Sequence, residues 1–312
     1  MVRAVLLHLL VGGVLALRAA GGISGANFAA LSPAATALQL SEWLGPGVVE
    51  GCVEARASPE CGGGLGVFST RALEPGERLA TVPLHKCIHA AAAAADPAIG
   101  QRCAALLRES ALSHGDGPTR GAERLCTAAM LAHVAFGDAD ANRDAADKWG
   151  PYVASLPWAL SDAADAADVA AVSGLACVAP HQASAALALV RSRGLGLSRR
   201  VSGLGEFEPR HLIVPFLDLF NHPSVSALNA YGANGFFATS LPLSDSCVQW
   251  HVTEDGGAVS VDAPEGAQTP CFCELWVWYT GTLPHEWTEE STTEFVRQYG
   301  FDPFSKTQAP LT

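Results

Sequence analysis

Strand-forming segments near both ends of this chain are separated by a long alanine-rich stretch, and this order constrains the fold more than any other feature. Between residues 52 and 88, short β-prone runs alternate with glycine and proline, a pattern typical of strands joined by tight turns. The sequence EPGE at residues 74–77 predicts one such turn, because proline fixes φ and glycine tolerates the left-handed region. From Phe207 onward strand signals return in HLIVPFLDLF, NGFFATS, VQWHVT, AVSVDA and ELWVWY.

The stretch from about residue 90 to residue 205 favours helices. It holds runs of alanine with leucine, valine and scattered charge, such as AAAAADPAIGQRCAALLRES and GAERLCTAAMLAHVAF. In the second run Leu125, Ala129, Ala132 and Phe136 recur at helical spacing, which predicts one buried stripe. Compositional drift toward alanine is the alternative explanation for the polyalanine itself. A β-unit interrupted by helices and then resumed predicts one discontinuous α+β domain.

Composition sets limits on the class of protein and on its partners. A chain of 312 residues that is 49% hydrophobic can build one large core or two modest ones, which excludes wholesale disorder. With 19 basic and 31 acidic residues the formal net charge is −12, so the long-range field repels phosphate backbones, and nucleic acid is not expected as a partner. The same field attracts a basic, lysine-bearing protein substrate.

The nine cysteines are odd in number and show no repeated spacing, which predicts mostly free, buried thiols instead of a disulfide scaffold. One close pair, Cys271 and Cys273, suggests a metal site only if a second pair or suitably spaced histidines accompany it. Neither is found in the sequence, so no metal is expected.

The first 40 residues have the character of a leader. Residues 1–21 combine a charged start, the apolar run AVLLHLLVGGVLAL and a small-residue exit, as signal peptides do, and that run is short for a membrane span. The following GISGANFAALSPAATA is rich in alanine and serine and nearly free of acid, as organelle transit segments are. The alternatives are a bipartite plastid leader, an ordinary secretory leader, and an unprocessed alanine-rich tail on a cytoplasmic protein. No stable membrane insertion is expected after leader removal.

Five motifs occur in an informative order. They are GLGVFST with LEPGE (64–77), WGPY with LP (149–157), LVRSR (189–193), VPFLDLFNH (214–222), and ELWVWY with YGF (274–301). This order resembles the SET-domain methyltransferases, in the class of the RuBisCO large-subunit methyltransferase and its actin-histidine-methylating relatives, whose SET halves are split by a helical insert. The likeness spans roughly residues 50 to 304.

The resemblance implies a fold and a division of the chain. It implies a SET-domain β-fold with a knot-like crossing, interrupted by the alanine-rich helical insert. The N-terminal part of the SET domain is then expected at 45–89, the insert at 90–205, the C-terminal part at 206–304 and a tail at 305–312.

The resemblance also implies that the chain uses S-adenosylmethionine to methylate a side-chain nitrogen of a protein, with lysine as the expected acceptor. Methyl transfer from a sulfonium is an in-line displacement, so the enzyme mainly holds donor and nucleophile collinear. The glycine-rich turn Gly64, Leu65 and Gly66 lets the backbone approach the cofactor without an intervening Cβ. By the resemblance, Asn221 and His222 hold the cofactor at the knot-like crossing. Taken alone, both motifs would read as plain turns.

Four further residues receive roles by the same resemblance. Arg193 is expected near the cofactor or target residue, although a charge at a helix C-terminus also explains it. Asp218 is expected to line the active-site end of the substrate channel. Tyr279 is expected to orient the target nitrogen through its hydroxyl, and Tyr299 to form another channel wall. A phenol of pKa near 10 is mostly protonated at neutral pH, so desolvation of the lysine ammonium eases its deprotonation instead.

Two departures from the family pattern leave alternatives open. Tyr279 is followed by Thr280 and Gly281 and then a longer loop, and Thr292 stands where relatives carry asparagine. Relatives also continue into a helical substrate-gripping domain where this chain reaches Thr312. A protein-lysine methyltransferase is therefore expected, with a protein-histidine methyltransferase, a catalytically weakened SET-fold binding module and a secreted structural protein as alternatives.

Overall fold

The computed structural model describes residues 33–58, 65–115, 117–158, 164–196, 207–220, 248–253 and 256–265, together with 269, 272, 274–275, 288 and 292–293. Before the helical stretch come α2 (Pro33–Leu44), β1 (Val53–Ala57), β2 (Leu65–Ser69), β3 (Arg78–Pro83), the 3₁₀ helix η1 (Leu84–Lys86) and β4 (Ile88–His89). The helices are α3 (Ala90–Ala95), α4 (Gly100–His114), α5 (Arg120–Phe136), α6 (Arg143–Ala154), α7 (Ala166–Ala176) and α8 (Pro180–Arg193). After them come β5 (Gly194–Gly196), β6 (His211–Ile213), the 3₁₀ helix η2 (Leu217–Leu219), β7 (Gln249–Val252), β8 (Ala258–Asp262) and β9 (Glu274–Leu275).

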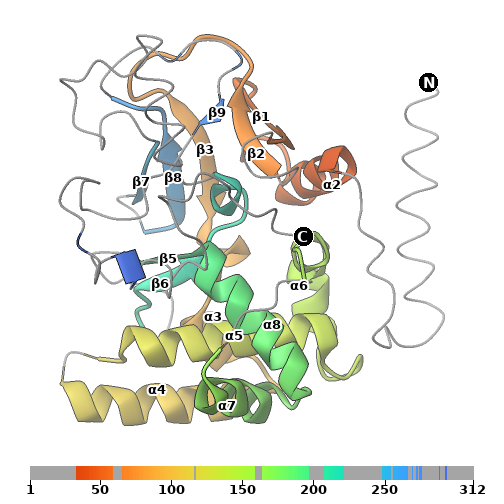
Figure 1. Ribbon diagram of the computed structural model, residues 1–312, viewed down its shortest axis with the longest axis vertical. Helices are drawn as coiled ribbons and strands as arrows, with labels where there is room; N and C mark the ends of the chain where they lie inside the picture. Colours follow the sequence, from red (N-terminus) through yellow and green to blue (C-terminus); the bar gives the residue numbers. More distant parts are fainter. Residues whose placement is uncertain are drawn as a thin grey trace.

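Strands from the two sides of the helical stretch pair with each other. Within the described residues they form three small sheets, in the orders β1-β2-β9, β3-β8-β7 and β4-β6-β5, and every pairing is antiparallel. Figure 1 shows the first two sheets at one end of the molecule, most of the helices at the other, and β5 and β6 between them. The α+β class that the sequence predicted is confirmed.

Helix α5 lies at the centre of the helical layer. It begins after Thr119, whose Oγ1 accepts the N–H of Ala122 at 3.2 Å and so satisfies a donor at the helix start. The helix contacts α3, α4, α6, α7 and α8, and every residue from Cys126 to Val134 is buried. The prediction of a single buried stripe was therefore wrong, because helices surround α5 and alanine fits against all of them.

Two predicted local features have different outcomes. The EPGE turn is confirmed: Glu77 donates its N–H to the carbonyl of Glu74 at 3.1 Å, and Gly76 has φ of 69°. The run HLIVPFLDLF was expected to be one strand, but it is extended only as far as Ile213 and then turns into η2. Pro215 explains the end of the strand, since it lacks the N–H that a ladder requires.

The described cysteines fit the prediction of free thiols. Cys52, Cys87, Cys103 and Cys126 are buried and free, and Cys177 is free and exposed. Cys271 and Cys273 lie outside the described residues. In the part of the chain that the structure describes, no single helix is long and apolar enough to cross a membrane, and α7 and α8 meet that test only jointly, as a pair bent by 106°.

Candidate active site

Arg193 and Asp218, two residues that the sequence predicted for the site, lie in direct contact. Nη1 of Arg193 donates to Oδ2 of Asp218 and to the main-chain carbonyl oxygen of the same residue, each at 3.1 Å. The hydroxyl of Tyr152 donates to the same Oδ2 at 2.7 Å. The side chain of Asp218 is fully buried and that of Arg193 is 20% exposed. The ends of α6 and α8 thus meet η2 at one carboxylate.

The backbone around Asp218 is tightly turned. Phe216 has φ of 76° and ψ of −48°, a rare conformation for a residue with a Cβ that costs of order 1–3 kcal/mol. The rings of Phe216 and Phe220 pack edge to face at 5.6 Å, and both residues are buried. Asp218 donates its N–H to the carbonyl of Val214 at 3.0 Å. This packing holds the strained turn and aims the carboxylate inward.

Gly194 places Arg193 at the end of α8. The glycine pairs with Ile213 of β6 and donates its N–H to the carbonyl of Val190, so the chain passes directly from helix to strand. A Cβ at Gly194 would overlap the ring of His211, which explains why glycine follows the LVRSR motif. Arg193 is therefore fixed by the strand that succeeds it.

Burial dominates the electrostatics of the cluster. It raises the pKa of Asp218, and the positive charge of Arg193 together with the hydrogen bonds from Tyr152 and Arg193 opposes that rise. The pKa of Tyr152 lies well above its usual value, first because of burial and then because of the adjacent carboxylate. Burial also raises the pKa of the Cys87 thiol, and the charge of Asp218 adds to that rise. Tyr152 therefore acts as a neutral donor and not as a base.

Leu65 and Gly66 lie at the start of β2, opposite Ala57 and Arg56 of β1. Leu65 is half-buried and Gly66 is buried, and β2 contacts η2. The strand after the glycine-rich turn therefore runs close to the turn that carries Asp218. The cofactor-binding role predicted for Leu65 and Gly66 stays a prediction.

The remaining predicted site residues lie outside the described part of the chain. They are Gly64, Asn221, His222, Tyr279 and Tyr299, and the predicted knot-like crossing falls there too. Tyr152, in contrast, is a described residue that received no role from the sequence. The WGPY motif contains it, but nothing in that motif names a partner 66 residues further along the chain.

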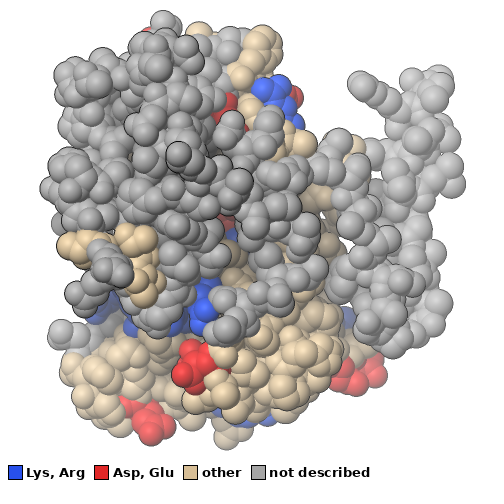
Figure 2. Space-filling view, viewed as in Figure 1, with Lys and Arg blue, Asp and Glu red and all other residues tan. Residues whose placement is uncertain are grey.

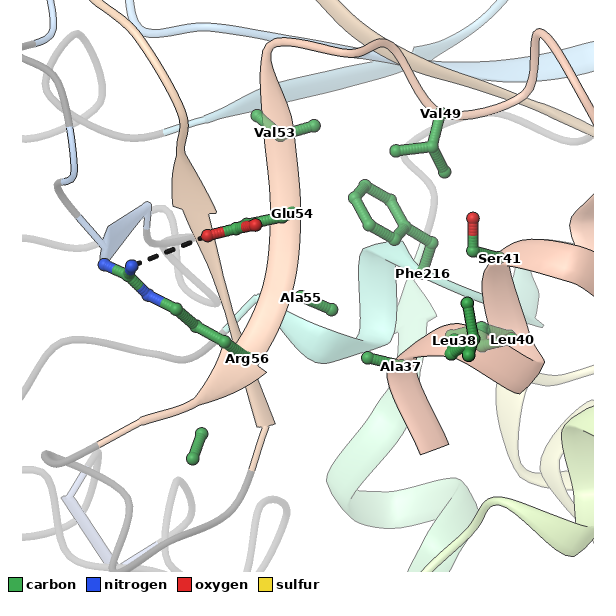
Figure 3. Close-up of a pocket in the computed structure, with 11 residues that line it drawn as sticks. Ala37, Leu38, Leu40, Ser41, Val49, Val53, Glu54, Ala55, Arg56 and Phe216 are labelled. Atoms are coloured by element: carbon green, nitrogen blue, oxygen red, sulfur yellow. Dashed lines mark ion pairs between the residues drawn. The ribbon is translucent and has the colours of Figure 1, made fainter. Parts of the chain in front are cut away.

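A cavity of about 610 Å³ opens beside this cluster, between α2 and β1. Its described lining is mostly apolar, and Figure 3 shows the ring of Phe216 between the two elements. Glu54 and Arg56 of β1 also line it and form an ion pair at 3.5 Å. Phe216 connects the cavity to η2, two residues before Asp218.

Comparison with known proteins bears on the fold. No family model matches the chain, and no curated protein matches it. Solved structures do: the SET domain of LSMT bound to lysine and AdoHcy (TM-score 0.54, 17% identity), Rubisco LSMT bound to AdoMet (0.52, 18%) and Rubisco LSMT bound to sinefungin and monomethyllysine (0.51, 18%). The chain has the SET-domain fold. The resemblance that the sequence motifs indicated is confirmed at the level of this fold.

These likenesses extend over most of this chain but not over the whole of the other proteins. Each covers 87% of this chain and 57% or 58% of the solved one. The chain therefore spans less than two thirds of the length of the SET-domain proteins that it matches. At such low identity the comparison establishes the fold, and activity has to be argued from the site.

Proposed function

We propose that this chain is an S-adenosylmethionine-dependent methyltransferase that modifies a side-chain nitrogen of a protein, with lysine as the acceptor. The observation that carries the proposal is the buried contact between Arg193 and Asp218, formed by two of the motifs that resemble the family, within a SET-domain fold. Of the solved structures of that fold, one is bound to lysine and AdoHcy, one to sinefungin and monomethyllysine, and one to AdoMet.

The described residues fit a ligand that carries an amino group. Oδ1 of Asp218 is buried and has no hydrogen-bond partner among the described residues, and an unsatisfied buried acceptor favours a donor from a bound molecule. Both the cofactor and a lysine side chain carry such a group. The cofactor supplies the electrophilic methyl group when bound.

The residues of this chain act by positioning the cofactor and the acceptor nitrogen. Asp218 and Arg193 fix the turn that leads, three residues later, to Asn221, the proposed cofactor ligand. Collinear placement of donor and acceptor accounts for most of the catalysis of an in-line transfer. Exclusion of water from the buried cluster strengthens each of its electrostatic interactions.

A SET-fold binding module is the second candidate function. The longer loop after Tyr279 and the threonine at position 292 favour it, because both depart from the pattern of active relatives. It predicts cofactor binding without methyl transfer, so the two candidates differ in one measurable step.

Calorimetry with S-adenosylmethionine tests the proposal first. Wild-type protein is expected to bind the cofactor, and Asn221→Ala to lose most of that binding. Transfer of labelled methyl groups to a lysine-rich protein, followed by hydrolysis, then separates methyllysine from methylhistidine. Binding with no labelled product would select the binding module, and absence of binding by the wild type would refute both candidates.

A further inference from the structure

Tyr152 connects three parts of the chain that are far apart in sequence. Its ring is stacked on the ring of Trp43 in α2, with centroids 5.8 Å apart and planes inclined by 20°. Its hydroxyl reaches Asp218 in η2 at 2.7 Å, and the residue is 1% exposed. The phenol is thus packed on one side by the first described helix and bonded at its tip to the candidate site.

The orientation of the Asp218 carboxylate depends on few donors. Tyr152 and Arg193 both bind Oδ2, whereas Oδ1 has no hydrogen-bond partner among the described residues. Arg193 is partly exposed and divides Nη1 between the carboxylate and a main-chain carbonyl. Tyr152 makes the shorter bond, from a position with no solvent access.

We infer that Tyr152 is a positioning residue of the proposed methyltransferase: its hydroxyl fixes the carboxylate of Asp218, and thereby the turn that leads into Asn221 and His222. The inference rests on the proposed function. Tyr152 acts through Asp218 and does not touch the reacting atoms, because its hydroxyl is buried against that carboxylate. The helical stretch therefore contributes a second residue to the site, in addition to Arg193.

Tyr152→Phe isolates the hydroxyl, because the ring and its stacking on Trp43 are retained. We expect the kcat for methyl transfer to fall about 10-fold or more, since small misplacements are costly in such reactions, while the KM for S-adenosylmethionine rises by a smaller factor, because Asn221 and His222 themselves are retained. A circular dichroism spectrum and a melting curve identify any loss of folded protein. Trp43→Phe is the control, because it alters the same packing but keeps the hydroxyl.

The pH profile separates positioning from general stability. Among the described residues, the titratable groups that face Asp218 are Arg193 on α8, Tyr152 on α6 and Cys87 between η1 and β4. The hydroxyl of Tyr152 lowers the pKa of Asp218, so its removal raises that pKa, and the carboxylate takes up a proton at a higher pH. The acid limb of the kcat profile is therefore expected to move to higher pH in Tyr152→Phe and to stay in place in Trp43→Phe.

Asp218→Asn completes the test because it removes the titrating group. When Tyr152→Phe is added to Asp218→Asn, the acid limb is expected not to move further. If transfer becomes too slow to measure, the pH dependence of cofactor binding serves as the readout. A profile of Tyr152→Phe that coincides with that of the wild type, with unchanged kcat, would overturn the inference alone. A wild type that neither binds nor transfers would overturn the proposed function and this inference together.

Discussion

Buried histidines that must stay uncharged control how this fold responds to acid. Nδ1 of His89 accepts the N–H of Ala92 at 3.1 Å and so caps α3, which requires the neutral ring. Burial, with Lys148 nearby, lowers the pKa of His89 to about 4. Burial likewise lowers the pKa of His211 to about 3. In the unfolded chain both rings take up a proton near pH 6.5.

The free energy of unfolding is therefore expected to fall as the pH falls from about 6.5 to 4, because only the unfolded state binds the protons in that window. His89 alone contributes up to about 3 kcal/mol of this loss. His89→Asn keeps a capping oxygen and does not titrate, so its loss of stability over the same window should be smaller. Urea unfolding at pH 7, 6 and 5 gives the free energy of unfolding of the wild type and of His89→Asn. If the two free energies fell equally with pH, His89 would not be the source of the loss.

At the residue scale the sequence could identify two of the three residues that meet in the described cluster. Arg193 and Asp218 lie in motifs whose order resembles a family, so they were predicted site residues. Tyr152 also lies in such a motif, but its hydrogen bond to Asp218 connects helix α6 to η2, which are far apart in the sequence. A contact of that kind depends on tertiary packing, which no local pattern reports. The cap at His89 was missed for a related reason, since histidine is not a typical N-cap residue.

Among the elements, two tryptophans connect α6 to two different neighbours: Trp43 joins α2 to α6, and Trp149 joins α6 to η1. Nε1 of Trp43 donates to the carbonyl of Lys148 at 3.1 Å, and Nε1 of Trp149 donates to the carbonyl of Lys86 at 3.2 Å. The ammonium of Lys86 donates to the carbonyl of Trp43 and lies 4.7 Å from the centre of its ring. Such cation–π contacts add about 0.5–2 kcal/mol each.

Trp43→Ala is expected to release α2 from the rest of the fold. It removes the indole, its hydrogen bond and the stacking on Tyr152, and the free energy of unfolding should fall by about 3 kcal/mol. Leu38→Ala on the same helix is the matched control, because Leu38 is 47% exposed and should change stability by less than about 0.5 kcal/mol. Hydrogen exchange of the α2 amides, faster only in Trp43→Ala, locates the effect. Equal exchange of the α2 amides in the two variants would refute the conclusion that Trp43 holds α2 in place.

Helix α5 illustrates what composition could and could not predict about the elements. Its alanine content correctly indicated a helix, but the position of a helix in a layer is read from contrast between polar and apolar faces. Alanine supplies little contrast, and the buried Glu123 and Thr127 follow no apolar stripe. The strands β4, β5, β6 and β9 are two or three residues long, too short for an alternating pattern, so their pairing was not predictable.

Over the whole molecule, the interruption of the β-unit was the most informative feature of the sequence, because it predicted that distant segments meet. In the structure β3 pairs with β8 and β4 with β6, across the entire helical stretch. Figure 2 shows that the acidic side chains visible on one face of the helical end stand apart from one another. An acidic surface for steering a basic substrate is therefore not a continuous patch on the described part of this face.

The helices and sheets share one hydrophobic core, which extends without a break from Leu40 through α5 to Leu275 within the described residues. A shared core predicts that the two layers unfold together. The slowest-exchanging amides of α5 and of β3 should therefore give opening free energies that agree within about 1 kcal/mol, with the same dependence on denaturant.

Native-state hydrogen exchange in increasing urea makes this comparison in one sample. If α5 opened several kcal/mol below β3, the helical stretch would be a separate cooperative unit. The bond between Tyr152 and Asp218 would then be broken whenever that unit opened, and Tyr152→Phe would weaken the coupling between the layers instead of the site. If the opening free energies of α5 and β3 agree in the wild type and still agree in Tyr152→Phe, the two layers remain coupled without the hydroxyl. The effect of the hydroxyl then belongs to the local geometry at Asp218.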